Sequence, residues 1–172
     1  MSIQSRVAEP HAPENELSSD LGVRAVLLAA QSVGVREEPP GSNWGRAVKV
    51  YLASVGIATP APWCAAFVNY KIHQAAQQLG VTTDWPRTGY CPTIAAWAKR
   101  NRRFLALPQP GCVFLVRDSA GRYRHTGFVS EVHADGTVST VEGNSNDTGS
   151  AEGIGVFSLR RSTARLRFVR IA

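Results

Sequence analysis

The residues with the clearest chemical potential surround a cysteine that follows a proline-bearing loop. Pro62 and Trp63 precede Cys64, and an apolar stretch with helical periodicity begins at the cysteine. The partial positive charge at a helix start favours a thiolate, and the thiolate rather than the thiol is the nucleophile. Cys64 is therefore a candidate catalyst, provided that a histidine can serve as its base.

Four histidines could be that base, and their places in the chain favour one of them. His11 lies in a polar N-terminal segment, and His133 lies at the tip of a predicted hairpin. His73 follows Cys64 on the same predicted helix, on the opposite face and about 13 Å along the axis. His125 remains, because it opens a predicted strand beside small residues that leave room for a thiol from another layer.

Two polar residues on the next strand could orient the imidazole. A two-residue turn at Asp135-Gly136 would place Glu142 opposite Val129, and both Glu142 and Asn144 on the face of His125. A slip of one residue would move both to the other face. A polar acceptor beside the ring fixes the tautomer of the imidazole and stabilises its charged form.

The elements that must position these residues are helices first and strands second. Apolar residues recur every three to four positions in the first part of the chain and every second position after it. The predicted helices cover residues 21 to about 34, 44–55, 63 or 64 to 79, and 92–98. The predicted strands cover residues 112–116, 127–132, 137–141, 155–159 and 166–171. This order predicts an α+β domain, with a helical layer against an antiparallel sheet.

The length and composition are those of one globular domain. The chain has 172 residues, of which 44% are hydrophobic and 19% are charged. Residues 1–18 contain two prolines and few large apolar groups, so we expect a flexible N-terminal arm followed by a single domain over residues 19–172. The three cysteines are too few and odd in number for a disulfide framework. Cys91, beside Pro92, is interpreted as a packing or helix-start residue, and Cys112 as a small buried hydrophobe.

The charge indicates anionic partners without choosing among them. The formal net charge is +6 and the isoelectric point is about 9.7. The sequence has neither zinc-finger spacing nor an aromatic RNA-binding signature, so we expect no nucleic acid partner. The arginines near the C-terminus, including Arg160 and Arg161, fit a solvated face as well as a binding patch. We expect no membrane span and no signal peptide, hence synthesis in the cytoplasm.

Three motifs in order resemble the CHAP family of cysteine- and histidine-dependent amidohydrolases and peptidases. They are PWCAAFV at residues 62–68, HTGFV at residues 125–129 and VEGNS at residues 141–145. The family is related to the NlpC-type cell-wall hydrolases and has a papain-like core. The resemblance covers roughly residues 35 to 150. It implies a papain-like α+β fold and cleavage of amide bonds in bacterial peptidoglycan.

Carried over residue by residue, the resemblance gives each motif a role. It makes Cys64 the nucleophile, His125 the general base and acid, Glu142 the residue that orients His125, and Asn144 a supporting polar residue. The backbone N–H of Cys64 is an expected oxyanion donor, with a second donor from residues 37–51.

Other expectations concern the substrate and the metal. Trp63, Asn43 and Tyr51 are predicted to bind substrate. Some family members bind calcium through an aspartate-rich loop, but residues 39–46 lack such carboxylates, so we expect no metal and no cofactor. Many family members have Pro-Gly-Asp before the first strand, whereas this chain has Pro110-Gly111-Cys112, with cysteine in place of the aspartate.

The expected function is therefore hydrolysis of a peptidoglycan amide bond through a thioester, by an endopeptidase or an N-acetylmuramoyl-L-alanine amidase. Such an enzyme would act in the periplasm or cell wall after delivery, as a phage lysin, a tail component or a secreted antibacterial effector. An effector would need delivery machinery and an immunity or inhibitor protein. Two alternatives remain open: a papain-like protease or acyltransferase directed at proteins, and a non-catalytic wall-binding module.

Overall fold

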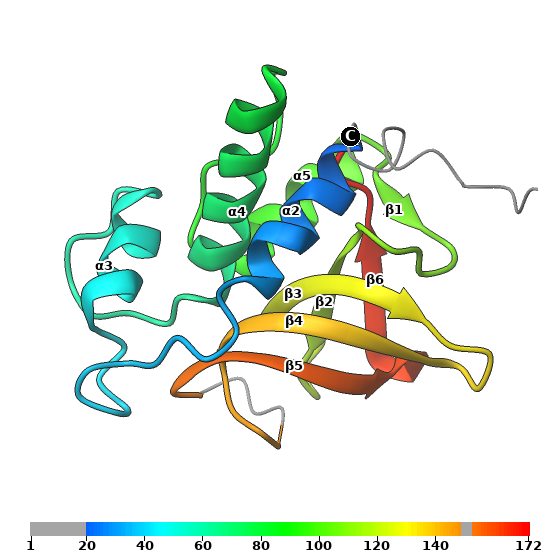
Figure 1. The fold of residues 1–172 in the computed structure, drawn as a ribbon. Helices are drawn as coiled ribbons and strands as arrows, with labels where there is room; N and C mark the ends of the chain where they lie inside the picture. The colour runs from blue at the N-terminus through cyan, green and yellow to red at the C-terminus, as the bar shows by residue number, and fades with distance from the viewer. Residues whose placement is uncertain (1–19, 149–152) are drawn as a thin grey trace, which may run out of the picture.

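The computed structural model describes residues 20–148 and 153–172, and it shows a helical layer packed on one face of a six-stranded sheet (Figure 1). All strand pairs in the sheet are antiparallel, with the order β1-β6-β2-β3-β4-β5. The predicted α+β architecture is confirmed. The expected arm at residues 1–18 lies outside the described residues.

The helices begin close to the capping signals of the sequence, but the first helix ends at Ala30, four residues before the predicted stop at Gly34. The helices are α2 (Leu21–Ala30), α3 (Arg46–Ala53), α4 (Cys64–Leu79) and α5 (Cys91–Arg100). The side chain of Asp20 caps α2 by accepting from the backbone N–H of Val23 at 3.0 Å. Gly80 ends α4 in the left-handed conformation that glycine adopts without strain (φ 67°). Helix α3 is shorter than predicted, because Gly45 before it has a φ of 128°.

Three strands extend further than the alternating pattern predicted, and the last strand ends two residues earlier than predicted. The strands are β1 (Phe104–Leu105), β2 (Val113–Arg117), β3 (Tyr123–Val132), β4 (Thr137–Ser145), β5 (Gly155–Ser162) and β6 (Leu166–Val169). Consequently His125 lies inside β3 rather than at its start, and Glu142 and Asn144 lie inside β4 rather than after it. The two residues of β1 were not predicted, because so short a segment has no detectable period.

The pairing of β3 with β4 differs from the prediction by two residues. Val129 lies opposite Thr140 instead of Glu142. One residue of this shift comes from a longer hairpin turn, since Val132 opposes Val138, and the other from an irregularity just after Val129. Because side chains alternate with a period of two, the two single shifts together keep Glu142 on its predicted face.

The sheet is buried on both faces in its central strands. Val113 and Leu115 belong to the core beneath the helices, whereas Phe114 between them belongs to a second cluster. That second cluster also contains Cys112, which is 1% exposed and whose pKa burial raises to about 11. Val129 belongs to the same cluster. The strands that carry His125 and Glu142 are therefore held from both sides.

We expect Gly143→Ala to destabilise the fold. A Cβ atom at Gly143 would lie 2.6 Å from Cζ3 of Trp63 and 2.7 Å from Cγ of Phe67, both fully buried side chains. Overpacking of this kind costs about 1–3 kcal/mol of unfolding free energy. Urea denaturation would measure the loss, with Ser158→Ala at an exposed position of β5 as the control. Equal stability of the Gly143→Ala variant and the wild type would contradict the packing described.

Candidate active site

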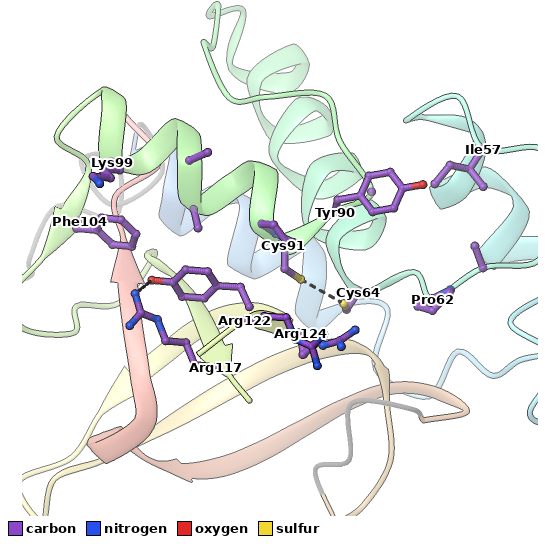
Figure 2. Close-up of a pocket in the computed structure, with 16 residues that line it drawn as sticks. Ile57, Pro62, Cys64, Tyr90, Cys91, Lys99, Phe104, Arg117, Arg122 and Arg124 are labelled. Atoms are coloured by element: carbon purple, nitrogen blue, oxygen red, sulfur yellow. Dashed lines mark hydrogen bonds between the residues drawn. The ribbon is translucent and has the colours of Figure 1, made fainter. Parts of the chain in front are cut away.

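Cys64 is the first residue of α4, and no side chain at the N-cap covers this end of the helix. Trp63 at the N-cap makes no side-chain capping bond, so the N–H groups of the first turn have no partner from that side chain. Cys64 is 4% exposed and lines a groove with a volume of about 1140 Å³ (Figure 2). The thiol therefore lies at a helix start and on the wall of a groove large enough for a peptide-sized ligand.

The imidazole of His125 is buried behind the groove and bound to a carboxylate. Its Nε2 lies 2.8 Å from Oε2 of Glu142, and the two residues are 1% and 0% exposed. Nδ1 is buried and makes no hydrogen bond of normal geometry within residues 20–148 and 153–172. It is thus the nitrogen left for the thiol of Cys64. Hydrogen bonds of this kind are often poorly aligned before substrate binds.

Glu142 keeps its charge in the interior because four groups bind it. Arg161 on β5 donates from Nε to Oε1 at 2.5 Å and from Nη2 to Oε2 at 2.6 Å. Thr140 donates to Oε1 at 2.6 Å and Ser145 to Oε2 at 3.3 Å, while His125 occupies the remaining side. A fully buried carboxylate is stable only with such partners. The interpretation of Arg161 as part of a solvated face or binding patch is wrong.

These contacts shift the pKa values of the buried pair in opposite directions. Burial would lower the pKa of His125, but its interactions with Cys64 and Glu142 raise it to about 9. Burial would raise the pKa of Glu142, but the hydrogen bonds from Arg161 and His125 lower it to about 2. At neutral pH the ring is therefore an imidazolium and the acid a carboxylate.

Cys91 is a site residue that sequence reasoning missed. It begins α5, in agreement with the predicted helix-start role, but its Sγ also lies 3.8 Å from Sγ of Cys64 (Figure 2). The thiol of Cys91 donates to Cys64 and holds the pKa of Cys64 well below its ordinary value. Burial alone would raise that pKa, whereas the interaction with His125 lowers it further. The pKa of Cys91 rises correspondingly, because of the same hydrogen bond and of burial. A short-range sequence pattern could not predict this contact, because the two cysteines begin different helices.

Asn144 joins three segments of the chain next to Cys64. Its Oδ1 accepts from the backbone N–H of Trp63 at 3.2 Å, and its Nδ2 donates to Oδ1 of Asn43 and to the carbonyl oxygen of Gly153. The side chain makes no hydrogen bond to His125 in the described part of the chain. Asn144 thus fixes the loop that leads into Cys64, which is a positioning role rather than a contact with the imidazole.

None of the three predicted substrate-binding residues lines the groove. Trp63 is fully buried, stacks on Tyr51 with ring centroids 5.7 Å apart, and donates its indole N–H to Glu37 at 2.8 Å. Asn43 donates its backbone N–H to the same carboxylate at 3.0 Å. Neither these residues nor any other in the range 37–51 lines the groove. Trp63 precedes Cys64 in the sequence, but it belongs to the hydrophobic core and not to the lining of the groove.

The described residues hold no cluster of three or more histidine, cysteine, aspartate or glutamate side chains that could bind a metal ion.

Within residues 20–148 and 153–172, no helix combines the length and apolar character needed to cross a bilayer. The reactive groups of the site are the thiolate of Cys64, the imidazolium of His125 and the carboxylate of Glu142.

Replacing Cys91 should change the acidity of the neighbouring thiol. We expect Cys91→Ala to raise the pKa of Cys64, because the alanine cannot donate to the thiolate. The pH dependence of alkylation by iodoacetamide, followed by mass spectrometry of the Cys64 peptide, would measure the change. Cys112→Ala, on the other side of the sheet, is the matched control. An unchanged apparent pKa in the Cys91→Ala protein would exclude this hydrogen bond.

Replacing Arg161 should expose the cost of burying Glu142. Arg161→Gln is expected to lose about 3 kcal/mol of unfolding free energy at pH 7, since the carboxylate stays buried without its cation. The pKa of Glu142 is lowered on folding, so its contribution is present above about pH 4.5 and is lost as the pH falls towards 2. The deficit should shrink over that window in urea titrations. Arg160→Gln, at an exposed neighbouring pair with Asp135, should change stability little.

Comparison with protein families gives one match. The model of the CHAP domain matches residues 56–144, just over half of the chain, and this range includes Cys64, His125, Glu142 and Asn144. No match was found among curated proteins or among solved structures. Membership of the family implies amidase or peptidase activity on peptidoglycan. The matched range, together with the papain-like arrangement of helix-start cysteine and strand histidine, shows that this chain belongs to the CHAP domain family of cysteine amidases and peptidases.

Proposed function

We propose that this protein hydrolyses an amide bond of peptidoglycan with Cys64 as nucleophile, His125 as general acid and base, and Glu142 as the residue that orients His125. The observation that carries the proposal is the buried contact of His125 with Glu142, which leaves Nδ1 for the thiol at the start of α4. A structural histidine would need neither a charged partner at zero exposure nor a thiol with a lowered pKa.

The reaction follows from the charges of these groups. The thiolate of Cys64 attacks the amide carbonyl, and the tetrahedral oxyanion forms beside the helix start, where the N–H of Cys64 can donate. The carbon–nitrogen bond breaks, and the amine leaves with the proton of His125. A water molecule then gives a proton to His125 and attacks the thioester. The acid leaves, and both the thiolate and the imidazolium are restored.

The biological setting that best fits the chain is delivery to the cell wall from outside or across the envelope. The net charge of +6 favours association with an anionic wall polymer. We infer action as a phage lysin or as a secreted antibacterial effector. An effector of this kind requires delivery machinery and, in the producing cell, an immunity or inhibitor protein.

Digestion of purified sacculi tests the reaction. The wild type should release new soluble fragments, and their masses would distinguish an amidase from an endopeptidase. Cys64→Ala should release none, whereas Cys112→Ala should release the same fragments as the wild type. If the reduced and folded wild type releases no fragments, the peptidoglycan assignment fails, and protein substrates become the first to examine.

The pH dependence of kcat/KM should be bell-shaped with an alkaline limb near pH 9. Above that pH the imidazolium of His125 loses the proton that the leaving amine needs. The acid limb should reflect Cys64, well below the ordinary pKa of a thiol. Glu142→Gln should move the alkaline limb to lower pH, because a neutral amide stabilises the imidazolium less. Activity that still rises through pH 10 would be incompatible with the charged pair.

A further inference from the structure

We propose that the groove beside Cys64 has a cationic arm that binds a carboxylate of the substrate peptide. The cationic arm consists of Lys99, Arg117, Arg122 and Arg124, all of which line the groove. The inference rests on the proposed function, because it assigns the substrate chemistry of the same site. It adds residues that play no part in the steps at Cys64 and His125.

The charge of the cationic arm is largely uncompensated. Its four cations face a groove whose lining contains no aspartate or glutamate. Asp118, next to the arm, pairs with Arg122 and Arg124, with Nε–Oδ2 distances of 3.0 Å in both cases. One carboxylate against four cations leaves a net charge of about +3 in this part of the groove, where like charges repel until an anion binds.

The cations follow the groove away from the nucleophile. In Figure 2, Arg124 lies towards Cys64, Arg117 lies further along, and Lys99 lies beside Phe104 at the far end. A peptide whose carbonyl reaches Cys64 would therefore extend its neighbouring residues over the cationic arm. The arrangement favours a ligand with more than one anionic group, or with one group several bonds from the scissile amide.

Arg117 is already oriented for a planar anion. Its Nη2 donates to the hydroxyl oxygen of Tyr123 at 2.7 Å, and its guanidinium carbon lies 4.6 Å from the centre of that ring. Stacking and one hydrogen bond reduce the conformational freedom of the side chain, while its other N–H groups stay available. A guanidinium held in this way binds a carboxylate with a smaller loss of entropy than a free one.

Apolar residues of the groove select the rest of the ligand. Ile57, Ala95 and Ala96 contribute small aliphatic groups to the lining, and Tyr90 and Phe104 add aromatic faces. The complementary ligand is amphipathic, with small apolar side chains against these residues and carboxylates against the cationic arm. A peptide stem with acidic residues has this chemistry, whereas a polyphosphate chain has no apolar groups to match the aliphatic residues.

A pair of soluble peptidoglycan fragments tests the cationic arm. One fragment keeps its peptide carboxylates, and the other carries them as amides. We expect the wild type to cleave the free acid about 10-fold more efficiently in kcat/KM, mainly through KM, and to lose the preference as salt is raised. In Lys99→Gln/Arg117→Gln, whose substituted side chains are exposed, the preference should fall to about 2-fold or less. Arg165→Gln, an exposed charge outside the groove, should keep it.

Equal cleavage of both fragments by the wild type, or an unchanged preference in the double variant, would overturn the proposal. Binding of the same two fragments to Cys64→Ala, measured by calorimetry, separates it from the proposed function. If the wild type cleaves neither fragment, the proposed hydrolysis fails. The proposed cationic arm is then supported only if Cys64→Ala binds the free acid more tightly than the amide and the double substitution removes this difference in affinity. Equal binding of the two fragments would refute the proposed arm.

Discussion

The site depends on one buried negative charge, the carboxylate of Glu142. A carboxylate at zero exposure is costly unless cations and hydrogen-bond donors surround it. Arg161, His125, Thr140 and Ser145 supply them from three adjacent strands. The register of β3, β4 and β5 is therefore an electrostatic requirement as well as a consequence of hydrophobic packing. A shift of β5 by one residue would turn Arg161 to the other face and leave Glu142 without its cation.

From Glu142 the charges alternate through the site. The guanidinium of Arg161 is positive, the carboxylate negative, the imidazolium of His125 positive and the thiolate of Cys64 negative. Each group is held in its charged form by its neighbours, so the buried set is neutral as a whole. Cys91 and the start of α4 stabilise the last charge, at the point where the set reaches the groove. The proposed nucleophile is thus already a thiolate in the protein without substrate.

Local signals in the sequence predicted most helices and strands, whereas the site residues that were missed depend on long-range contacts. The start of α4 at Cys64 and its end at Gly80 followed from a proline-bearing loop and a glycine stop. The face of Glu142 followed from the period of two, although the pairing itself was two residues off. Arg161 could not be found in this way, because its contact depends on how β5 pairs with β4. Cys91 lies 27 residues from Cys64, and the thiols meet because α4 and α5 both pack against β3.

The most direct test of this account is the protonation state of His125 in the intact protein. Nitrogen-15 NMR of the imidazole nitrogens, assigned with a His125→Gln variant, reports whether both carry protons. We expect a doubly protonated ring at pH 7.5 in the wild type, with titration near pH 9, and a lower pKa in Cys64→Ala, where the thiolate is missing. A neutral His125 at pH 7.5 in the wild type would contradict the alternating charges from Arg161 to Cys64.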